Sequence, residues 1–282
     1  MLSGQADEGT AETAVARLCH RGDEMLLRVR VALPDRPGAL GQVARTLGVA
    51  GADIVQVVVL ERQNGRAVDD FTLMWPGASR VEQLINDLSA LPGVRVDGVW
   101  RANGAPIIGG DAELLAQVAA NPADGLAILV DAVPELLAAD WAVAAVVPAD
   151  WAIRNGATPR PARLEPVPMP SLDSPADSEG PAVTYASWRA PDPLRVPEVT
   201  PLRPRAMTGP DGTRYAVVPF GRAGLVLIVA RTDSGELSAP EFHRCEVERA
   251  AQLVRAAATI LGDRLDLVIA APAGLPAVPT RT

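Results

Sequence analysis

The most constraining feature of this sequence is a strand pattern that leads through a Pro-Gly turn directly into a helix pattern. Residues 27–33 alternate between large apolar residues and polar or small ones, which is typical of a strand with one buried face. From Leu40 to Leu47 the apolar residues recur at helical spacing. Between them, Pro37 has the φ of a first helical turn, and Gly38 lets another group approach the backbone closely. The pattern predicts an open helix N-terminus, which favours a small anion such as a carboxylate.

The composition limits the classes of partner that suit this chain. Its 282 residues give a prior of two domains, and 48% hydrophobic with 21% charged residues is an ordinary globular balance. The net charge of −8 and the lack of a clustered basic stripe argue against nucleic acid or an anionic membrane surface as the main partner. We therefore expect small ligands.

Cysteine spacing and hydropathy bear on the location of the protein. Cys19 and Cys245 are too distant in sequence for a disulfide framework, and no apolar run approaches the ~20 residues that span a bilayer. Both observations favour the cytoplasm. Residues 1–24 are polar and weakly periodic, and we expect them to be a disordered extension. Met25 stands where the first strand begins, so a true start at Met25 is an alternative.

Residues 25–101 form a first predicted domain with six elements in the order βαββαβ. The elements are a strand at 25–33, a helix at 37–50, strands at 53–61 and 67–75, a helix at 79–91 and a strand at 94–100. Asn64-Gly65 between the second and third strands is a strong hairpin signal. This order is the ferredoxin-like split-βαβ arrangement, an antiparallel sheet with two helices on one face. The 53–61 strand then lies at a sheet edge, where a second copy could pair with it.

The same order, with D-R-P-G-A-L after the first strand and G-A-D-I before the second, resembles an ACT domain, a regulatory module that binds amino acids. The resemblance implies a homodimer and a ligand site where the first loop meets the start of the second strand. The residues that it places at this site are Asp35, Arg36, Pro37, Gly38, Ala39, Leu40, Asp53 and Ile54. The family commonly has Asn where this chain has Asp53. A carboxylate there favours a ligand ammonium group, so an amino acid or similar small zwitterion is expected.

Simpler interpretations of these residues stay open. Pro37-Gly38 can serve only to make a tight turn, and Asp53 only to begin a strand. The domain would then be a dimerisation or protein-interaction scaffold without a ligand. Asp69 and Asp70 look like a pair of carboxylates, but strand geometry sends them to opposite faces, and we expect both to be solvated.

A linker at 102–110 is predicted to lead into a second domain at 111–264. Its expected elements are helices beginning near Asp111 and Asp124, strands at 141–147, 183–188, 213–220 and 224–231, and a long helix after a cap at Ser238. A long irregular insertion is expected at about 155–212, and a C-terminal tail at 265–282. The layout, with YAVVPF and LVLIVART before the long helix, more weakly resembles a GAF domain, an α/β sensory module with a central antiparallel sheet. The cyclic-nucleotide signature of that family is absent.

No set of side chains in the sequence forms a recognisable catalytic or metal site. The chain has two histidines, and no Walker loop, G-x-S-x-G or G-x-G-x-x-G sequence occurs. On one helix His243 and Cys245 would point about 200° apart, which disfavours a shared metal. We therefore expect a non-catalytic α+β regulatory protein without a cofactor, which binds an amino acid at its first domain and signals through its second.

Overall fold

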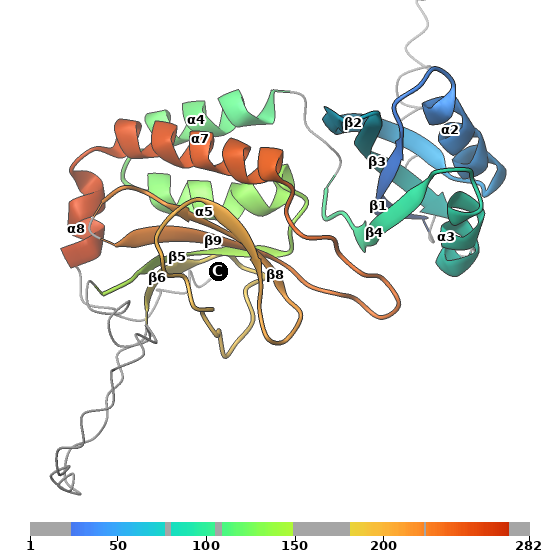
Figure 1. The fold of residues 1–282 in the computed structure, drawn as a ribbon. Helices are drawn as coiled ribbons and strands as arrows, with labels where there is room; N and C mark the ends of the chain where they lie inside the picture. The colour runs from blue at the N-terminus through green and yellow to red at the C-terminus, as the bar shows by residue number, and fades with distance from the viewer. Residues whose placement is uncertain (1–23, 77–79, 105–108, 149–180, 223, 271–282) are drawn as a thin grey trace, which may run out of the picture. The chain divides into compact units, whose positions relative to one another are not determined.

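The computed structural model describes residues 24–76, 80–104, 109–148, 181–222 and 224–270, and it divides the chain into two units (Figure 1). Unit 1 comprises Met1–Ala105 and unit 2 comprises Pro106–Thr282. Each unit combines helices with one antiparallel sheet, so the fold class is α+β. The predicted extension before Glu24, much of the predicted insertion and most of the predicted tail lie outside the described residues.

Unit 1 has the βαββαβ order that the sequence predicts. Its elements are β1 (Glu24–Pro34), α2 (Ala39–Val49), β2 (Asp53–Gln63), β3 (Arg66–Pro76), α3 (Val81–Ser89) and β4 (Arg95–Arg101). The strand order β2-β3-β1-β4 leaves β2 at an edge, as predicted. Both helices lie on the same side of the sheet in Figure 1. Asn64 and Gly65 have φ of 54° and 72°, so both occupy the left-handed region that a two-residue hairpin needs.

The core of unit 1 lies between the sheet and its two helices. One face of β1 contributes fully buried apolar side chains, and β3, α2 and α3 contribute the rest of the layer. The buried members are Leu27, Val29, Val31, Leu33, Val43, Leu47, Phe71, Leu73, Leu84 and Leu88. Burying each large one contributes about 1.5–3 kcal/mol, so this face fixes the register of β1 and β3.

The start of α2 differs from the sequence prediction. The helix begins at Ala39, and Gly38 is its N-cap with φ of 87°, so Pro37 lies before the helix. A Cβ added to Gly38 would meet nothing within 4 Å. The glycine is therefore needed for its left-handed backbone conformation, because no described protein group lies close to it.

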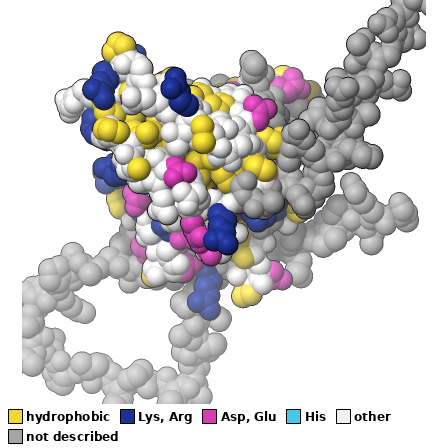
Figure 2. All heavy atoms as spheres, turned by 90° about the vertical axis from the view of Figure 1, so that its right-hand side faces the viewer, with side chains coloured by type: hydrophobic (Ala, Val, Ile, Leu, Met, Phe, Trp, Pro, Cys, Tyr) yellow, Lys and Arg dark blue, Asp and Glu magenta, His cyan; other side chains and the backbone are white. Residues whose placement is uncertain are grey.

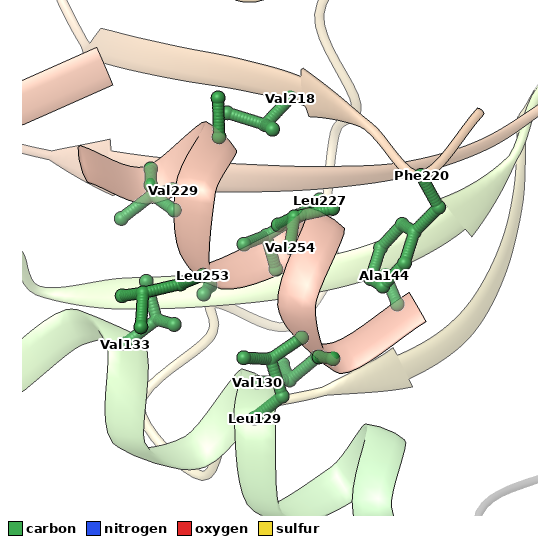
Figure 3. Packing of buried hydrophobic residues seen from close by; sticks show 14 of the residues in the cluster. Leu129, Val130, Val133, Ala144, Val218, Phe220, Leu227, Val229, Leu253 and Val254 are labelled. Atoms are coloured by element: carbon green, nitrogen blue, oxygen red, sulfur yellow. The ribbon is translucent and has the colours of Figure 1, made fainter. Parts of the chain in front are cut away.

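Unit 2 contains a five-stranded antiparallel sheet in the order β6-β5-β9-β8-β7. Its elements are α4 (Gly110–Ala120), α5 (Gly125–Leu136), β5 (Trp141–Val146), β6 (Ala182–Ala186), β7 (Arg205–Thr208), β8 (Arg214–Pro219), β9 (Leu225–Arg231), α7 (Arg244–Leu261) and α8 (Arg264–Ala270). The helices α4, α5 and α7 lie on one face of this sheet in Figure 1. Figure 3 shows the layer between them, where Leu129 and Val133 of α5 and Val254 of α7 pack toward Leu227 and Val229 of β9.

The opposite face of this sheet is covered by part of the predicted insertion. Val199 is fully buried, and it packs in one apolar cluster with Val217 and Ile228 of the sheet. The predicted strand at 183–188 ends at Ala186, and the segment 189–204 has no helix or strand, as predicted, but forms part of the core. The short strand β7 within the insertion was not predicted, because four residues carry too little alternation to be recognised.

Two predictions about the C-terminal part were wrong. The long helix α7 begins at Arg244, and its N-cap is His243 instead of Ser238. His243 and Glu246 form the capping box, in which each side chain accepts a hydrogen bond from the other's backbone N–H. The first residues of the predicted tail form α8, which Leu265 anchors because its side chain is 1% exposed.

Candidate functional site

A cavity lies where the β1–α2 loop meets the edge strand β2. Its volume is about 360 Å³, which is within the ~300–1,000 Å³ typical of small-molecule sites. The lining residues are Leu33, Pro34, Asp35, Arg36, Pro37, Gly38, Leu40, Val59, Arg62, Ala67 and Asp69. Five of the predicted site residues, those from Asp35 to Gly38 together with Leu40, are therefore brought together on this cavity, whereas Ala39 is buried behind it in the core.

A β-bulge in β2 places Arg62 on this cavity. Val59 pairs with Asp69, and Arg62 pairs with Ala67, so the register of β2 against β3 shifts by one residue between them. In a regular strand, residues three apart face opposite sides. The extra residue brings Val59 and Arg62 to the same face, the one that α2 and α3 cover. The sequence pattern of β2 alone would have placed Arg62 on the other side.

Asp35 of the loop and Arg62 of the edge strand form an ion pair at the rim of the cavity. Arg62 donates from Nε, 3.1 Å from Oδ1 of Asp35, and from Nη2 to the same oxygen. The hydrogen bond to Asp35 and its charge raise the pKa of the Arg62 guanidinium. The Arg62 side chain is 64% exposed, so this pair contributes little to stability and orients the loop against β2.

Asp69 is the buried charge of the site. The residue is only 2% exposed, and its Oδ1 has no hydrogen-bond partner among the described residues. Cross-strand neighbours on the same face are Val31 on β1 and Val59 on β2, both apolar. Burial raises the pKa of the Asp69 carboxyl, Arg62 opposes this increase, and the charges of Asp70 and Asp35 add to it. The expectation that Asp69 is solvated was therefore wrong.

The N-terminus of α2 supplies the opposite polarity. Gln42 donates to the Gly38 carbonyl at 3.1 Å, which is the first hydrogen bond of the helix ladder, and the amide of Ala39 donates back to Arg36. The amides of Leu40 and Gly41 precede the first intrahelical donors. Unpaired amides and the helix dipole at this end favour an anion.

Asp53 and Ile54 do not line this cavity within the same chain. Asp53 pairs with Met74 and Arg62 with Ala67, at opposite ends of the β2–β3 ladder. Nine residues of strand separate Asp53 from Arg62, which is on the order of 30 Å at about 3.3 Å per residue. Asp53 also neighbours Met74, whose side chain alternates with that of Leu73 and so faces away from the helices. The buried carboxylate that the cavity does contain is that of Asp69.

Other parts of the described chain offer weaker candidates. A groove of about 320 Å³ beside α8 is lined by apolar side chains and Arg264, without converging polar groups. His243 Nδ1 lies 3.2 Å from Cys245 Sγ, because His243 is the N-cap and lies outside the helix. The prediction that the two side chains point about 200° apart was therefore wrong. Among the described residues no three His, Cys, Asp or Glu side chains form a group that could hold a metal ion.

Apolar side chains are exposed around the cavity and along the edge strand. Val55, Val57 and Val59 of β2 are 45%, 37% and 51% exposed, and Leu40 at the cavity is 42% exposed. Figure 2 shows hydrophobic side chains interspersed with arginine and acidic side chains on the side of the molecule that carries α2 and α3. Contiguous exposed apolar side chains on an unpaired edge strand are typical of an interaction surface.

Comparisons with known proteins give little further guidance. No family model matches the chain, and no curated protein does. A solved structure of an unknown protein from Galdieria sulphuraria is similar at 18% identity, over 45% of this chain and 73% of that chain, with a TM-score of 0.26. No helix among the described residues is long and apolar enough to cross a membrane.

Proposed function

We propose that this protein is a non-catalytic regulatory protein whose unit 1 binds an amino acid or similar small zwitterion in the cavity at the β1–α2 loop. The observation that carries the proposal is the opposed polarity of one small cavity. Leu40 lies at the open N-terminus of α2, and Asp69 places a buried carboxylate on the sheet beneath the loop. A zwitterion can satisfy both, with its carboxylate at the helix end and its ammonium group at the carboxylate.

The topology of unit 1 supports a resemblance to ACT domains. The order βαββαβ, the sheet order β2-β3-β1-β4 and the helices on one face are what that resemblance implies. The cavity also lies at the first loop, where the resemblance expects a ligand. The ligand partner within the chain is then Asp69 in place of Asp53.

A homodimer through β2 is part of the proposal. Edge strands of this length, with exposed Val55, Val57 and Val59, tend to be covered by another chain. Two copies related by a two-fold axis would pair their β2 strands antiparallel.

Unit 2 is proposed to transmit the bound state to a partner protein. Its five-stranded antiparallel sheet, with α4, α5 and α7 on one face, supports a resemblance to GAF sensory domains. The other face is occupied by the chain's own segment around Val199. A role in signalling without a ligand of its own is therefore the simpler proposal for unit 2. The wide separation of Cys19 and Cys245 keeps the cytoplasm as the proposed location.

A thermal-shift panel of the twenty amino acids tests the proposal. A ligand that binds the folded state raises the unfolding temperature by mass action, by an amount that corresponds to about 2.7 kcal/mol at one hundred times its Kd. We expect one amino acid, or a chemically related group of them, to raise the melting temperature at millimolar concentration. If none of the twenty amino acids raises the melting temperature, binding with ordinary regulatory affinity is refuted.

The exposed edge strand favours a second candidate, a ligand-free dimerisation or protein-interaction scaffold. The exposed valines of β2 are the observation behind it. This scaffold predicts a negative amino-acid panel together with a dimer in solution. Regulatory binding predicts that at least one amino acid raises the melting temperature. The thermal-shift panel, together with the oligomeric state in solution, therefore separates the two functions.

A further inference from the structure

Two neighbouring aspartates of β3 are both buried, and among the described residues only one of them has a partner for both of its carboxylate oxygens. Asp70 is 1% exposed and receives two hydrogen bonds from Arg30, from Nε to Oδ1 at 2.6 Å and from Nη2 to Oδ2 at 2.8 Å. Asp69 is 2% exposed, and its Oδ1 has no partner among the described residues. The described part of the chain thus provides a buried arginine for the Asp70 carboxylate and no donor for Oδ1 of Asp69.

An unpaired buried carboxylate oxygen is costly for the folded protein. Leaving a buried acceptor unsatisfied costs roughly 1–3 kcal/mol, and more when the group is charged. Buried polar atoms without partners are rare in folded proteins and often mark functional sites. Asp69 is one of the residues that line the cavity at the β1–α2 loop, so a ligand in this cavity lies beside its side chain.

The arginine whose charge acts on the Asp69 carboxyl already donates hydrogen bonds to Asp35. Arg62 acts on the Asp69 carboxyl through its charge, but its guanidinium donates from both Nε and Nη2 to Asp35. Asp69 also lies between the apolar side chains of Val31 and Val59, which leave no other donor in the same row of the sheet. A donor from a ligand must then be compact and positively charged, and a primary ammonium group is both.

We infer that Asp69 recognises a protonated primary amine of the ligand and that this contact makes the cavity select amines over neutral analogues of the same shape. The inference rests on the proposed function, because it names the residue that reads one end of the proposed zwitterion. A hydroxyl in place of the ammonium would supply a weaker, neutral hydrogen bond to a charged acceptor. Selectivity follows because the cost of burying Asp69 is offset only by a cationic donor.

Paired ligands and one isosteric substitution test the inference. Each amino acid that stabilises the wild-type protein is compared by calorimetry with its 2-hydroxy acid, for example L-leucine with L-2-hydroxyisocaproate. We expect the wild type to bind the amino acid about 10- to 100-fold more tightly than the hydroxy acid, as for one charge-assisted hydrogen bond. In Asp69→Asn this preference should disappear, because the affinity for the amino acid should fall by about 10-fold or more. Asp87→Asn, on α3 and outside the cavity, is the matched control and should bind like the wild type.

The outcomes distinguish this inference from the proposed function. Equal affinities of the wild type and Asp69→Asn for the amino acid would overturn the role of Asp69 and leave amino-acid binding intact. Equal affinities of the wild type for the amino acid and the hydroxy acid would do the same. No binding of either ligand to the wild type would overturn both proposals. Retained binding of the hydroxy acid by Asp69→Asn shows that the variant is folded, so its loss of preference then supports the inference.

Discussion

The buried ion pair between Arg231 and Glu246 should be decisive for the stability of unit 2. Arg231 is fully buried on β9, and it donates to Glu246, to the carbonyl of Leu137 and to that of Ala138 at 3.0 Å. Its guanidinium also lies 4.0 Å from the centre of the Phe242 ring. Glu246→Gln removes the carboxylate that pairs with Arg231 and keeps the size of the side chain.

The magnitude follows from the burial of both groups. Removing one partner of a buried pair leaves an uncompensated charge and costs about 3–5 kcal/mol. Glutamine keeps one acceptor oxygen, so we expect the lower end, about 3 kcal/mol. For a unit of 150–250 residues, each kcal/mol lowers the melting temperature by roughly 2–4 °C, which gives about 6–12 °C. Hydrogen exchange of the amides in β9 and α7 reports unit 2 alone, and their protection should fall about 100-fold.

A second glutamate on the same helix is the matched control. Glu248 pairs with Arg244 at 3.1 Å, but the two side chains are 56% and 85% exposed. Glu248→Gln should therefore change stability by no more than about 0.5 kcal/mol. If the two substitutions lower the protection of β9 equally, burial does not set the cost, and the reasoning from the Arg231 environment is wrong.

Three further predictions concern charge and assembly. The pKa of Asp69 is raised above its usual 3.8, so its contribution to stability is complete below that pH and is lost as the pH rises through the folded pKa. Asp69→Asn should therefore stabilise the ligand-free protein at neutral pH, by roughly 1 kcal/mol in urea unfolding, and this gain should vanish in acid. Burial first, and then the hydrogen bond to Asp131, raise the pKa of Tyr185 from 10.0 to about 12. The stability of the folded protein should therefore fall as the pH rises from 10.0 to about 12. Phenolate absorbance should detect the transition, and Tyr185→Phe should abolish its contribution. Val57→Lys should convert a β2-paired dimer to monomers in light scattering, and an unchanged mass would refute the pairing.

The sequence determined the local order of the chain. Alternation and helical spacing are properties of a few neighbouring residues, and they were enough to give the βαββαβ order of unit 1 and the edge position of β2. Asn64-Gly65 fixed the hairpin because few residues adopt two successive positive φ angles. The position of the β1–α2 loop at a cavity followed from the same local pattern.

The tertiary structure alone decided which side chains meet at the cavity. Arg62 reaches it because a bulge shifts the register of β2, and no local pattern announces an extra residue in a strand. Asp69 is buried because β1, β2 and the loop enclose it, whereas its immediate sequence resembles a solvated strand start. Burial of a charge depends on neighbours that are distant in the sequence, and so does the lack of a donor to Asp69 Oδ1 among the described residues. For this reason the sequence could indicate the loop, and only the folded sheet could identify Asp69 as the carboxylate opposite it.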